Sequence, residues 1–210
     1  MRVIVELLDH QSGEFIEAEL FDEVTIDHFL ETQREWRPVV TEAALYLAKA
    51  GAKPILVPRH FHWDWTKKEA DLRMLAITFY GLGCGGALQG LMKLLTVGHT
   101  CRLPEQAGKP LVYVDYLEAA PWNIKPLMNA LGKAPRYGGI GTLLLEAAVQ
   151  KSKDEGFKGR LALHSLPTSE QFYLKACGMT AVGRDPAKQN LLWLEYTPEQ
   201  AERFITRGTA

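Results

Sequence analysis

Residues 111–117 are the segment that most constrains the fold of this chain. The run reads Leu-Val-Tyr-Val-Asp-Tyr-Leu, so apolar and aromatic side chains occupy both faces of an extended segment. β-Branched and aromatic residues favour strands, and a strand that is apolar on both faces belongs in the middle of a covered sheet. The sequence therefore predicts an α/β fold with this strand near the centre of the sheet.

Turn and capping residues divide the rest of the chain into strands and helices. Turn-forming residues 9–13 separate two apolar runs, which predicts an N-terminal hairpin. The segment at 87–97 fits either a returning strand or a short helix. The expected strands are 2–8, 14–21, 72–80, 111–117, 159–164, 179–183 and 191–196, and the expected helices are 26–35, 39–50, 142–155, a short helix ending before Gly178, and 198–206.

Length and composition fit one soluble globular domain. The 210 residues are 47% hydrophobic and 23% charged, and the formal net charge of -1 gives no electrostatic reason to expect a nucleic acid or an anionic membrane as partner. Acidic residues follow Met1 before any long apolar run, so no secretory signal is predicted, and no apolar stretch is long enough to span a bilayer. We therefore expect a cytoplasmic protein.

The cysteines and histidines do not predict a metal site. Cys84, Cys101 and Cys177 are odd in number and have no CxxC spacing, which argues against a disulfide framework and a thiolate zinc site. His60, His62 and Asp64 alternate, as three metal ligands on one strand would. Two tryptophans lie among them, so we favour an aromatic wall of an acceptor pocket and expect no metal.

A glycine-rich loop precedes the helix expected at 142–155. The loop reads Arg136-Tyr137-Gly138-Gly139-Ile140-Gly141, and its glycines let the backbone approach a ligand closely. Backbone N–H groups at a helix N-terminus bind phosphate well. The alternative is a tight turn whose glycines only permit close packing.

The order of segments around this loop resembles the GNAT superfamily of acyl-CoA N-acyltransferases. The apolar strand is followed by a Pro-containing exit, Arg-x-x-Gly-x-Gly, a helix, a strand, and a short helix with Phe172-Tyr173 ahead of Gly178. The resemblance implies a mixed, twisted sheet with a splayed pair of central strands and acetyl-CoA as co-substrate. It implies one domain of residues 1–210, in which residues 72–196 form the acyl-CoA-binding core and residues 1–70 an elaboration on the acceptor side.

The resemblance also implies roles for individual residues. Tyr173 corresponds to the tyrosine that protonates the departing thiolate, and a phenol keeps its proton at neutral pH. The backbones of Leu117 and Ala119 would pair with the pantetheine arm. The pyrophosphate would be held by Arg136, Tyr137, Gly138, Gly139, Ile140, Gly141 and Thr142.

An amine that attacks a thioester must lose a proton, so a general base is required. Glu118, at the end of the central strand, is the first candidate. Asp115 lies on the opposite face by strand alternation, and His164 follows the next strand. Each of the three can instead satisfy a structural hydrogen bond.

Other interpretations remain open at this stage. Residues 81–86 satisfy the G-x-G-x-x-G fingerprint of an NAD(P)-dependent oxidoreductase, although we favour a hairpin turn there. A non-catalytic coenzyme A-binding module is a second alternative. The insertion between Pro121 and Arg136 departs from the GNAT pattern and could shape the pocket for a small-molecule or peptide amine, or a homodimer contact.

Overall fold

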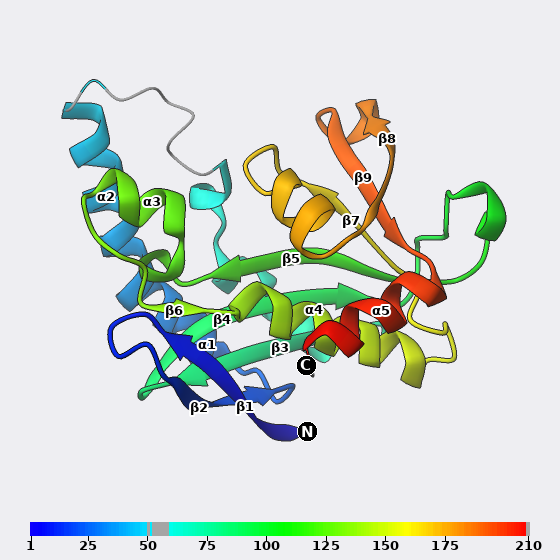
Figure 1. Cartoon of the computed structure of the whole chain (residues 1–210), viewed down its shortest axis with the longest axis horizontal. Coiled ribbons are helices and arrows are strands. Elements are labelled where there is room, and N and C mark those ends of the chain that lie inside the picture. Colours follow the sequence, from blue (N-terminus) through cyan, green and yellow to red (C-terminus); the bar gives the residue numbers. More distant parts are fainter. Residues whose placement is uncertain (50, 52–58, 209–210) are drawn as a thin grey trace. The chain divides into compact units, whose positions relative to one another are not determined.

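The computed structural model describes residues 1–49, 51 and 59–208, and within them the chain forms a mixed sheet of nine strands with helices (Figure 1). The strand order is β6-β1-β2-β3-β4-β5-β7-β9-β8. β5 pairs with β7 in parallel, whereas β1 with β2, β2 with β3, and β9 with both β7 and β8 pair antiparallel. The predicted α/β class with a mixed sheet is confirmed.

The chain begins with a β-hairpin and ends with an α-helix. The strands are β1 (Arg2–Asp9), β2 (Phe15–Phe21), β3 (Ile77–Cys84), β4 (Ala87–Leu95), β5 (Val112–Ala119), β6 (Tyr137–Gly138), β7 (Leu161–Ser165), β8 (Thr180–Asp185) and β9 (Leu191–Tyr196). The α-helices are α1 (Ile26–Glu31), α2 (Arg37–Lys49), α3 (Lys125–Ala130), α4 (Ile140–Asp154) and α5 (Pro198–Gly208).

The chain divides into two compact units. Unit 1 comprises Met1–Met74, Phe79–Leu91 and Leu117–Leu144. Unit 2 comprises Leu75–Thr78, Met92–Tyr116 and Leu145–Ala210. The strands β3, β4 and β5 and the helix α4 contribute residues to both units.

The predicted central strand is confirmed, because β5 has β4 on one side and β7 on the other. Its register with β7 covers residues 112–114 against residues 161–163, although β5 continues to Ala119 and β7 to Ser165. The two strands therefore part after a short paired stretch. This is the splay that the resemblance implies.

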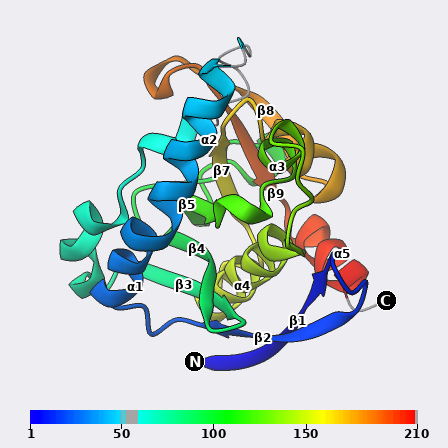
Figure 2. The same ribbon diagram turned by 90° about the vertical axis from the view of Figure 1, so that its left-hand side faces the viewer.

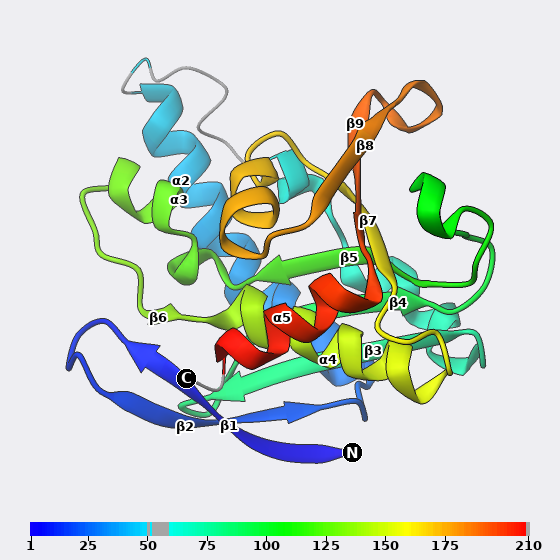
Figure 3. The same ribbon diagram turned by 45° about the vertical axis from the view of Figure 1, so that its right-hand side comes forward.

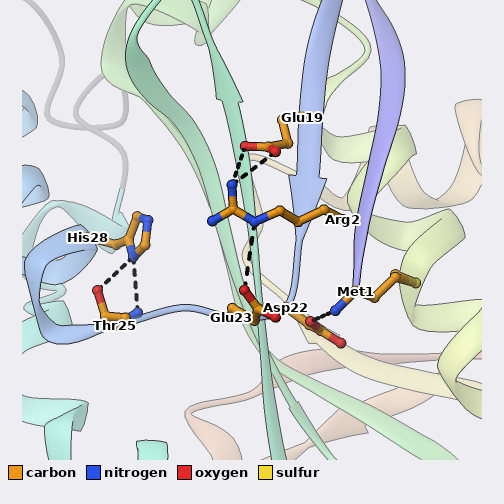
Figure 4. Close-up of polar contacts among 7 residues, drawn as sticks. All are labelled: Met1, Arg2, Glu19, Asp22, Glu23, Thr25 and His28. Atoms are coloured by element: carbon orange, nitrogen blue, oxygen red, sulfur yellow. Dashed lines mark hydrogen bonds and ion pairs between the residues drawn. The ribbon is translucent and has the colours of Figure 1, made fainter.

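The N-terminal hairpin of unit 1 is also confirmed, with Arg2 opposite Phe21 and Leu8 opposite Phe15. Polar contacts hold its open end (Figure 4). The Arg2 guanidinium donates to both carboxylate oxygens of Glu19 at 3.1 and 3.3 Å, and the amino group of Met1 pairs with Asp22. These contacts fix the hairpin where the chain turns toward α1.

The two helices predicted at 26–35 and 39–50 are one continuous helical segment (Figure 2). A π-helical turn, Thr32–Trp36, joins α1 to α2, and the Arg37 N–H donates to the Thr32 carbonyl five residues back. Pro38 has no N–H and would clash with a carbonyl in a regular α-helix, so the wider turn accommodates its ring. The predicted break is therefore wrong, and Ala50 lies outside the described residues.

The strand predicted at 72–80 begins later than expected, at Ile77, and extends to Cys84. A 3₁₀ helix, Trp65–Arg73, precedes it and begins at Asp64, whose carboxylate accepts the Thr66 N–H at 3.1 Å. A Cβ atom at Gly81 would lie 2.4 Å from the Phe21 ring, so glycine there permits close approach of β2. Gly81 therefore belongs to a strand and not to a turn.

The turn after β3 consists of Gly85 and Gly86, with φ angles of 61° and 76°. Two successive residues with positive φ are typical of a two-residue hairpin loop. The following segment is strand β4, which settles the choice left open for residues 87–97. The helix that a dinucleotide fingerprint requires does not follow these glycines, so the hairpin interpretation is confirmed.

Unit 2 contains the antiparallel strands β7, β9 and β8, which lie side by side in that order (Figure 3). Ala162 of β7 and Trp193 of β9 form a buried cluster with Cys101, Leu111 and Tyr113. α5 begins with the predicted capping box: the Thr197 N–H donates to Gln200 Oε1 at 2.9 Å, and the Gln200 N–H donates to Thr197 Oγ1 at 3.3 Å. Among the described residues, no helix combines the length and the apolar character that a bilayer span requires.

Candidate active site

The glycine loop joins a short strand to the start of a long helix within unit 1. Tyr137 and Gly138 form β6, which pairs with Asp9 and Leu8 of β1. Gly139 has a φ of 93°, a conformation that glycine adopts without strain, and α4 begins at the next residue. The loop therefore leads directly into the N-terminus of a 15-residue helix.

The backbone donors of this loop are not equivalent. The Arg136 N–H donates to the Trp122 carbonyl at 2.9 Å, and the Tyr137 N–H donates to Asn123 Oδ1 at 3.0 Å. The Leu143 N–H donates to the Gly139 carbonyl at 3.0 Å, and this is the first hydrogen bond of α4. The N–H groups of Ile140, Gly141 and Thr142 belong to the first turn, where no partner exists within the helix.

A side-chain clamp holds the start of the loop. Gln89 of β4 is buried, and its Oε1 accepts hydrogen bonds from Trp122 Nε1 and Asn123 Nδ2, both at 2.9 Å. Gln89 Nε2 donates to the Cys84 carbonyl at 3.0 Å, which ties the clamp to the β3–β4 turn. This role was not predicted from the sequence, in which Gln89 is one of two polar residues, with Lys93, in a mainly apolar run.

Close packing also fixes the beginning of α4. A Cβ atom at Gly90 would lie 2.7 Å from Ile140 Cγ2 and 3.0 Å from Leu144 Cδ1. Only a glycine in β4 lets the first turns of this helix come so near. The orientation of the first-turn N–H groups is therefore set by β4.

Two neighbouring cavities of unit 1 open beside the loop. The first measures about 280 Å³ and is lined by Cys84, Gly85, Ala87, Gln89, Trp122, Arg136 and Tyr137. The second measures about 390 Å³ and shares Cys84, Gly85 and Ala87 with the first. Its wall also carries the carboxylates of Glu17, Glu19 and Glu31.

Glu118 is a buried carboxylate near the end of β5. Its side chain is 9% exposed, Oε2 accepts a hydrogen bond from Trp65 Nε1 at 2.7 Å, and Oε1 lies 4.0 Å from His60 Nε2. Burial raises the pKa of Glu118 from 4.5 to about 7, against the lowering effects of the Trp65 hydrogen bond and the charges of Lys68 and Arg37. Such a group changes protonation state near neutral pH, as a general base must.

His60 lies beside this carboxylate and is neutral at pH 7. Burial, with a smaller contribution from His62, lowers the pKa of His60 from 6.5 to about 4. Trp63 packs against the His60 imidazole with ring centroids 5.4 Å apart. The aromatic segment at 60–65 thus contributes two side chains to the surroundings of Glu118, a contact that sequence analysis did not predict.

The residues considered as metal ligands do not lie on a strand. His60 and His62 belong to the 3₁₀ helix Arg59–His62. Asp64 caps the next 3₁₀ helix, and its Oδ1 also accepts a hydrogen bond from Gln33 Nε2 at 2.9 Å. The alternating face that the metal interpretation requires is therefore not formed.

The other two candidate bases belong to unit 2 and are engaged in polar contacts. Asp115 Oδ2 lies 2.8 Å from Lys93 Nζ. His164 Nδ1 lies 2.7 Å from the Tyr113 hydroxyl, and its Nε2 lies 3.1 Å from Asp185 Oδ2. Burial lowers the pKa of His164, although the Asp185 hydrogen bond opposes this effect. Both ring nitrogens of His164 thus have protein partners.

Tyr173 lies in the π-helical segment Phe172–Ala176 of unit 2 and is buried. Burial raises its pKa above the ordinary range, so the phenol stays protonated at neutral pH. The phenol therefore carries a proton, although the raised pKa makes it a weaker acid than an exposed tyrosine. Its assignment to the departing thiolate stays a prediction, as do the backbone roles of Leu117 and Ala119.

No protein-family model matches the sequence, and no curated protein matches it. The structure is similar to the PaiA N-acetyltransferase of Thermoplasma acidophilum, solved in complex with coenzyme A, with a TM-score of 0.54, 15% identity and coverage of 87% of this chain and 99% of that chain. It is also similar to an uncharacterised protein of Bacillus halodurans, with a TM-score of 0.57, 14% identity and coverage of 96% and 94%. Identities this low establish the fold alone. The chain therefore has the fold of the GNAT N-acetyltransferases.

Proposed function

We propose that this protein is an N-acetyltransferase that transfers the acetyl group of acetyl-CoA to the amine of a small molecule or peptide. The observation that carries the proposal is the glycine loop that leads into the N-terminus of α4. The N–H groups of Ile140, Gly141 and Thr142 lie at the positive end of the helix dipole, which favours a diphosphate. The similarity to PaiA, which was solved with coenzyme A, supports this cofactor.

The cavity beside the loop fits the cofactor's charge. Arg136 lines it, and its guanidinium lies 5.0 Å from the centre of the Tyr137 ring. In the proposed complex Arg136, Tyr137, Gly138 and Gly139 surround the pyrophosphate, and the backbones of Leu117 and Ala119 pair with the pantetheine arm. The splay of β5 from β7 leaves backbone groups of β5 available for such pairing.

Glu118 acts as the general base in the proposed reaction. It takes a proton from the acceptor nitrogen, whose lone pair then attacks the thioester carbonyl. The C–N bond forms, the C–S bond breaks, and the departing sulfur takes up a proton, a role for which Tyr173 stays the predicted donor. Backbone N–H groups stabilise the oxyanion. Because the acceptor nitrogen attacks the thioester directly, no covalent enzyme intermediate is needed.

The larger cavity supports a cationic acceptor. Glu17, Glu19 and Glu31 line it. The Glu19 carboxylate is paired with Arg2, so Glu17 and Glu31 supply the negative charge of the wall, which raises the local concentration of positively charged amines. Glu31 Oε1 also accepts the Leu88 N–H at 2.6 Å, which fixes one carboxylate at the wall. We therefore place primary amines carrying a second positive charge first in an acceptor screen.

A matched pair of variants at Thr142 tests the cofactor site. Thr142→Asp places a negative charge in the first turn of α4, where it stabilises the helix but repels a diphosphate, whereas Thr142→Asn has nearly the same shape and no charge. Like charges about 5 Å apart repel by about 3 kcal/mol at an effective dielectric constant of about 20. Isothermal titration with acetyl-CoA should therefore show binding weakened by roughly tenfold to hundredfold in the aspartate variant relative to the asparagine variant.

Three results would contradict the proposal at different points. Absence of acetyl-CoA binding by folded wild-type protein would overturn the proposed function. Equal affinities of the two Thr142 variants for acetyl-CoA would show that its diphosphate does not bind at the start of α4. Binding without thiol release, across amines assayed with a thiol reagent, would favour a non-catalytic coenzyme A-binding module.

A further inference from the structure

The two oxygens of the Glu118 carboxylate have different surroundings. Oε2 accepts the Trp65 Nε1–H at 2.7 Å, the distance of a strong hydrogen bond to a charged acceptor. Oε1 faces His60 Nε2 across 4.0 Å, which exceeds hydrogen-bonding distance. The carboxylate is therefore held on one side, while its other oxygen faces a neutral imidazole.

Trp65 is suited to hold a carboxylate in one orientation. Its side chain is 1% exposed, and its ring packs against Phe29 and Phe79 with centroids 5.8 and 6.4 Å away. The indole N–H can donate a hydrogen bond but cannot accept one. The Trp65 N–H therefore stabilises the charged form of Glu118 and engages Oε2 in that form.

We propose that Trp65 is a positioning residue for the base: it holds Oε2 of Glu118, so that Oε1, the oxygen beside His60, takes the proton of the acceptor amine. This inference rests on the proposed function, because it assigns an atom and an orientation to the proton transfer described above. The proton passes from the acceptor nitrogen to Oε1, and the nitrogen lone pair becomes free to attack the thioester.

Charged and titratable groups on the surrounding elements shift the pKa of Glu118. His60 lies on the segment Arg59–His62, Lys68 on the helix of Trp65, and Arg37 on α2. Lys68 and Arg37 lower the pKa of Glu118, as Trp65 does, while burial raises it. Removing the indole N–H leaves burial and both cations in place, so the pKa of Glu118 must rise.

The direct test follows the protonation of Glu118 by ¹³C NMR in protein labelled at the glutamate carboxyl carbon. Trp65→Phe removes the donor and keeps an aromatic ring, and Glu118→Gln identifies the resonance. Loss of a hydrogen bond to a charged group should raise the midpoint by about one pH unit. Trp36→Phe is the matched control, because the buried Trp36 indole donates to the Leu88 carbonyl at 3.2 Å and should leave the midpoint unchanged.

A second measurement needs no substitution at Trp65. In wild-type protein labelled with ¹⁵N, the Trp65 indole N–H resonance should titrate with the same midpoint as Glu118. The titration should vanish in Glu118→Gln. An indole resonance that stays constant while Glu118 titrates would overturn the inference, even if Trp65→Phe fails to fold.

Neither NMR experiment requires acetyl-CoA or an acceptor, so each tests the Trp65 contact separately from the proposed function. Kinetics with an active acceptor complete the test. The acidic limb of kcat/KM should move to higher pH in Trp65→Phe by the shift that NMR records, and stay in place in Trp36→Phe. A shifted NMR midpoint with an unmoved acidic limb would show that Glu118 is not the base and would overturn the assignment of Oε1.

Discussion

At the scale of single residues, Glu118 and His60 titrate in opposite directions for one physical reason. Burial disfavours the charged form of any side chain. It raises the pKa of Glu118 to about 7 and lowers that of His60 to about 4. Between these values both groups are mainly neutral, so the pair acquires its negative charge only near neutral pH.

This shift predicts how Glu118 affects stability. The protonated form is favoured in the folded state, so its stabilising effect is complete below the unfolded pKa of 4.5 and is lost as pH rises to about 7. Glu118→Gln keeps a neutral acceptor for Trp65 at every pH. The free energy of unfolding of the variant should therefore rise relative to wild type by about 3 kcal/mol between pH 4.5 and pH 8.

Urea unfolding at a series of pH values measures this difference. Glu105→Gln is the control for the loss of one carboxylate, because Glu105 is exposed. A difference that stays flat with pH for Glu118→Gln would mean that the Glu118 carboxylate is ionised in the folded protein at mildly acidic pH.

The sequence singled out Glu118 as a candidate base because it lies at the end of an apolar strand. Neither its burial nor its partners were predicted from the sequence. Trp65 lies 53 positions earlier in the chain, and only the packed aromatic cluster brings its indole to Oε2. A contact of this kind depends on tertiary packing, which no local pattern records.

At the scale of elements, the approach of β4 to α4 fixes the glycine loop. The contact distances at Gly90 leave no room for a methyl group between Ile140 and Leu144. Gly90→Ala should therefore displace the start of α4 and lower the free energy of unfolding by about 1–3 kcal/mol. Acetyl-CoA affinity should fall with it, because the first-turn donors move.

Gly83→Ala provides the comparison for Gly90→Ala. A Cβ atom at Gly83 would lie 3.7 Å from the Phe21 ring, which is ordinary contact. Thermal unfolding should show this variant to be close to wild type. Equal effects of the two substitutions would mean that loss of glycine in a strand, and not the contact with α4, determines the change.

Elements were predictable where a local signal defines them. The strand at 111–117, the hairpin at the N-terminus and the Thr197–Gln200 capping box all depend on neighbouring residues, and all three are present. The helix break expected near Pro38 is absent, because a π-helical turn accommodates the proline. The late start of β3 likewise depends on Asp64 capping a 3₁₀ helix, which apolar content alone does not indicate.

At the scale of the whole molecule, the two compact units share their secondary structure. β3, β4, β5 and α4 each run through both, so neither unit can lose its strands without disrupting elements of the other. We therefore expect one cooperative unfolding transition.

Fluorine NMR of protein containing fluorinated tryptophan tests this cooperativity. Trp193 reports on unit 2, and the remaining four tryptophans lie in unit 1: Trp36, Trp63, Trp65 and Trp122. All native resonances should disappear with the same urea midpoint. A separate midpoint for Trp193 would show that the units unfold independently.

The hydrogen bond from the Arg136 N–H to the Trp122 carbonyl closes residues 123–135 into a loop with both ends at one point. Within that loop, Leu127 and Met128 of α3 pack against Ala43 and Leu47 of α2. Because Asn123 also accepts the Tyr137 N–H and α3 packs in this buried cluster, both parts support the glycine loop. Variation that leaves the glycine loop in place is therefore expected at the exposed residues 132–134, between α3 and Arg136.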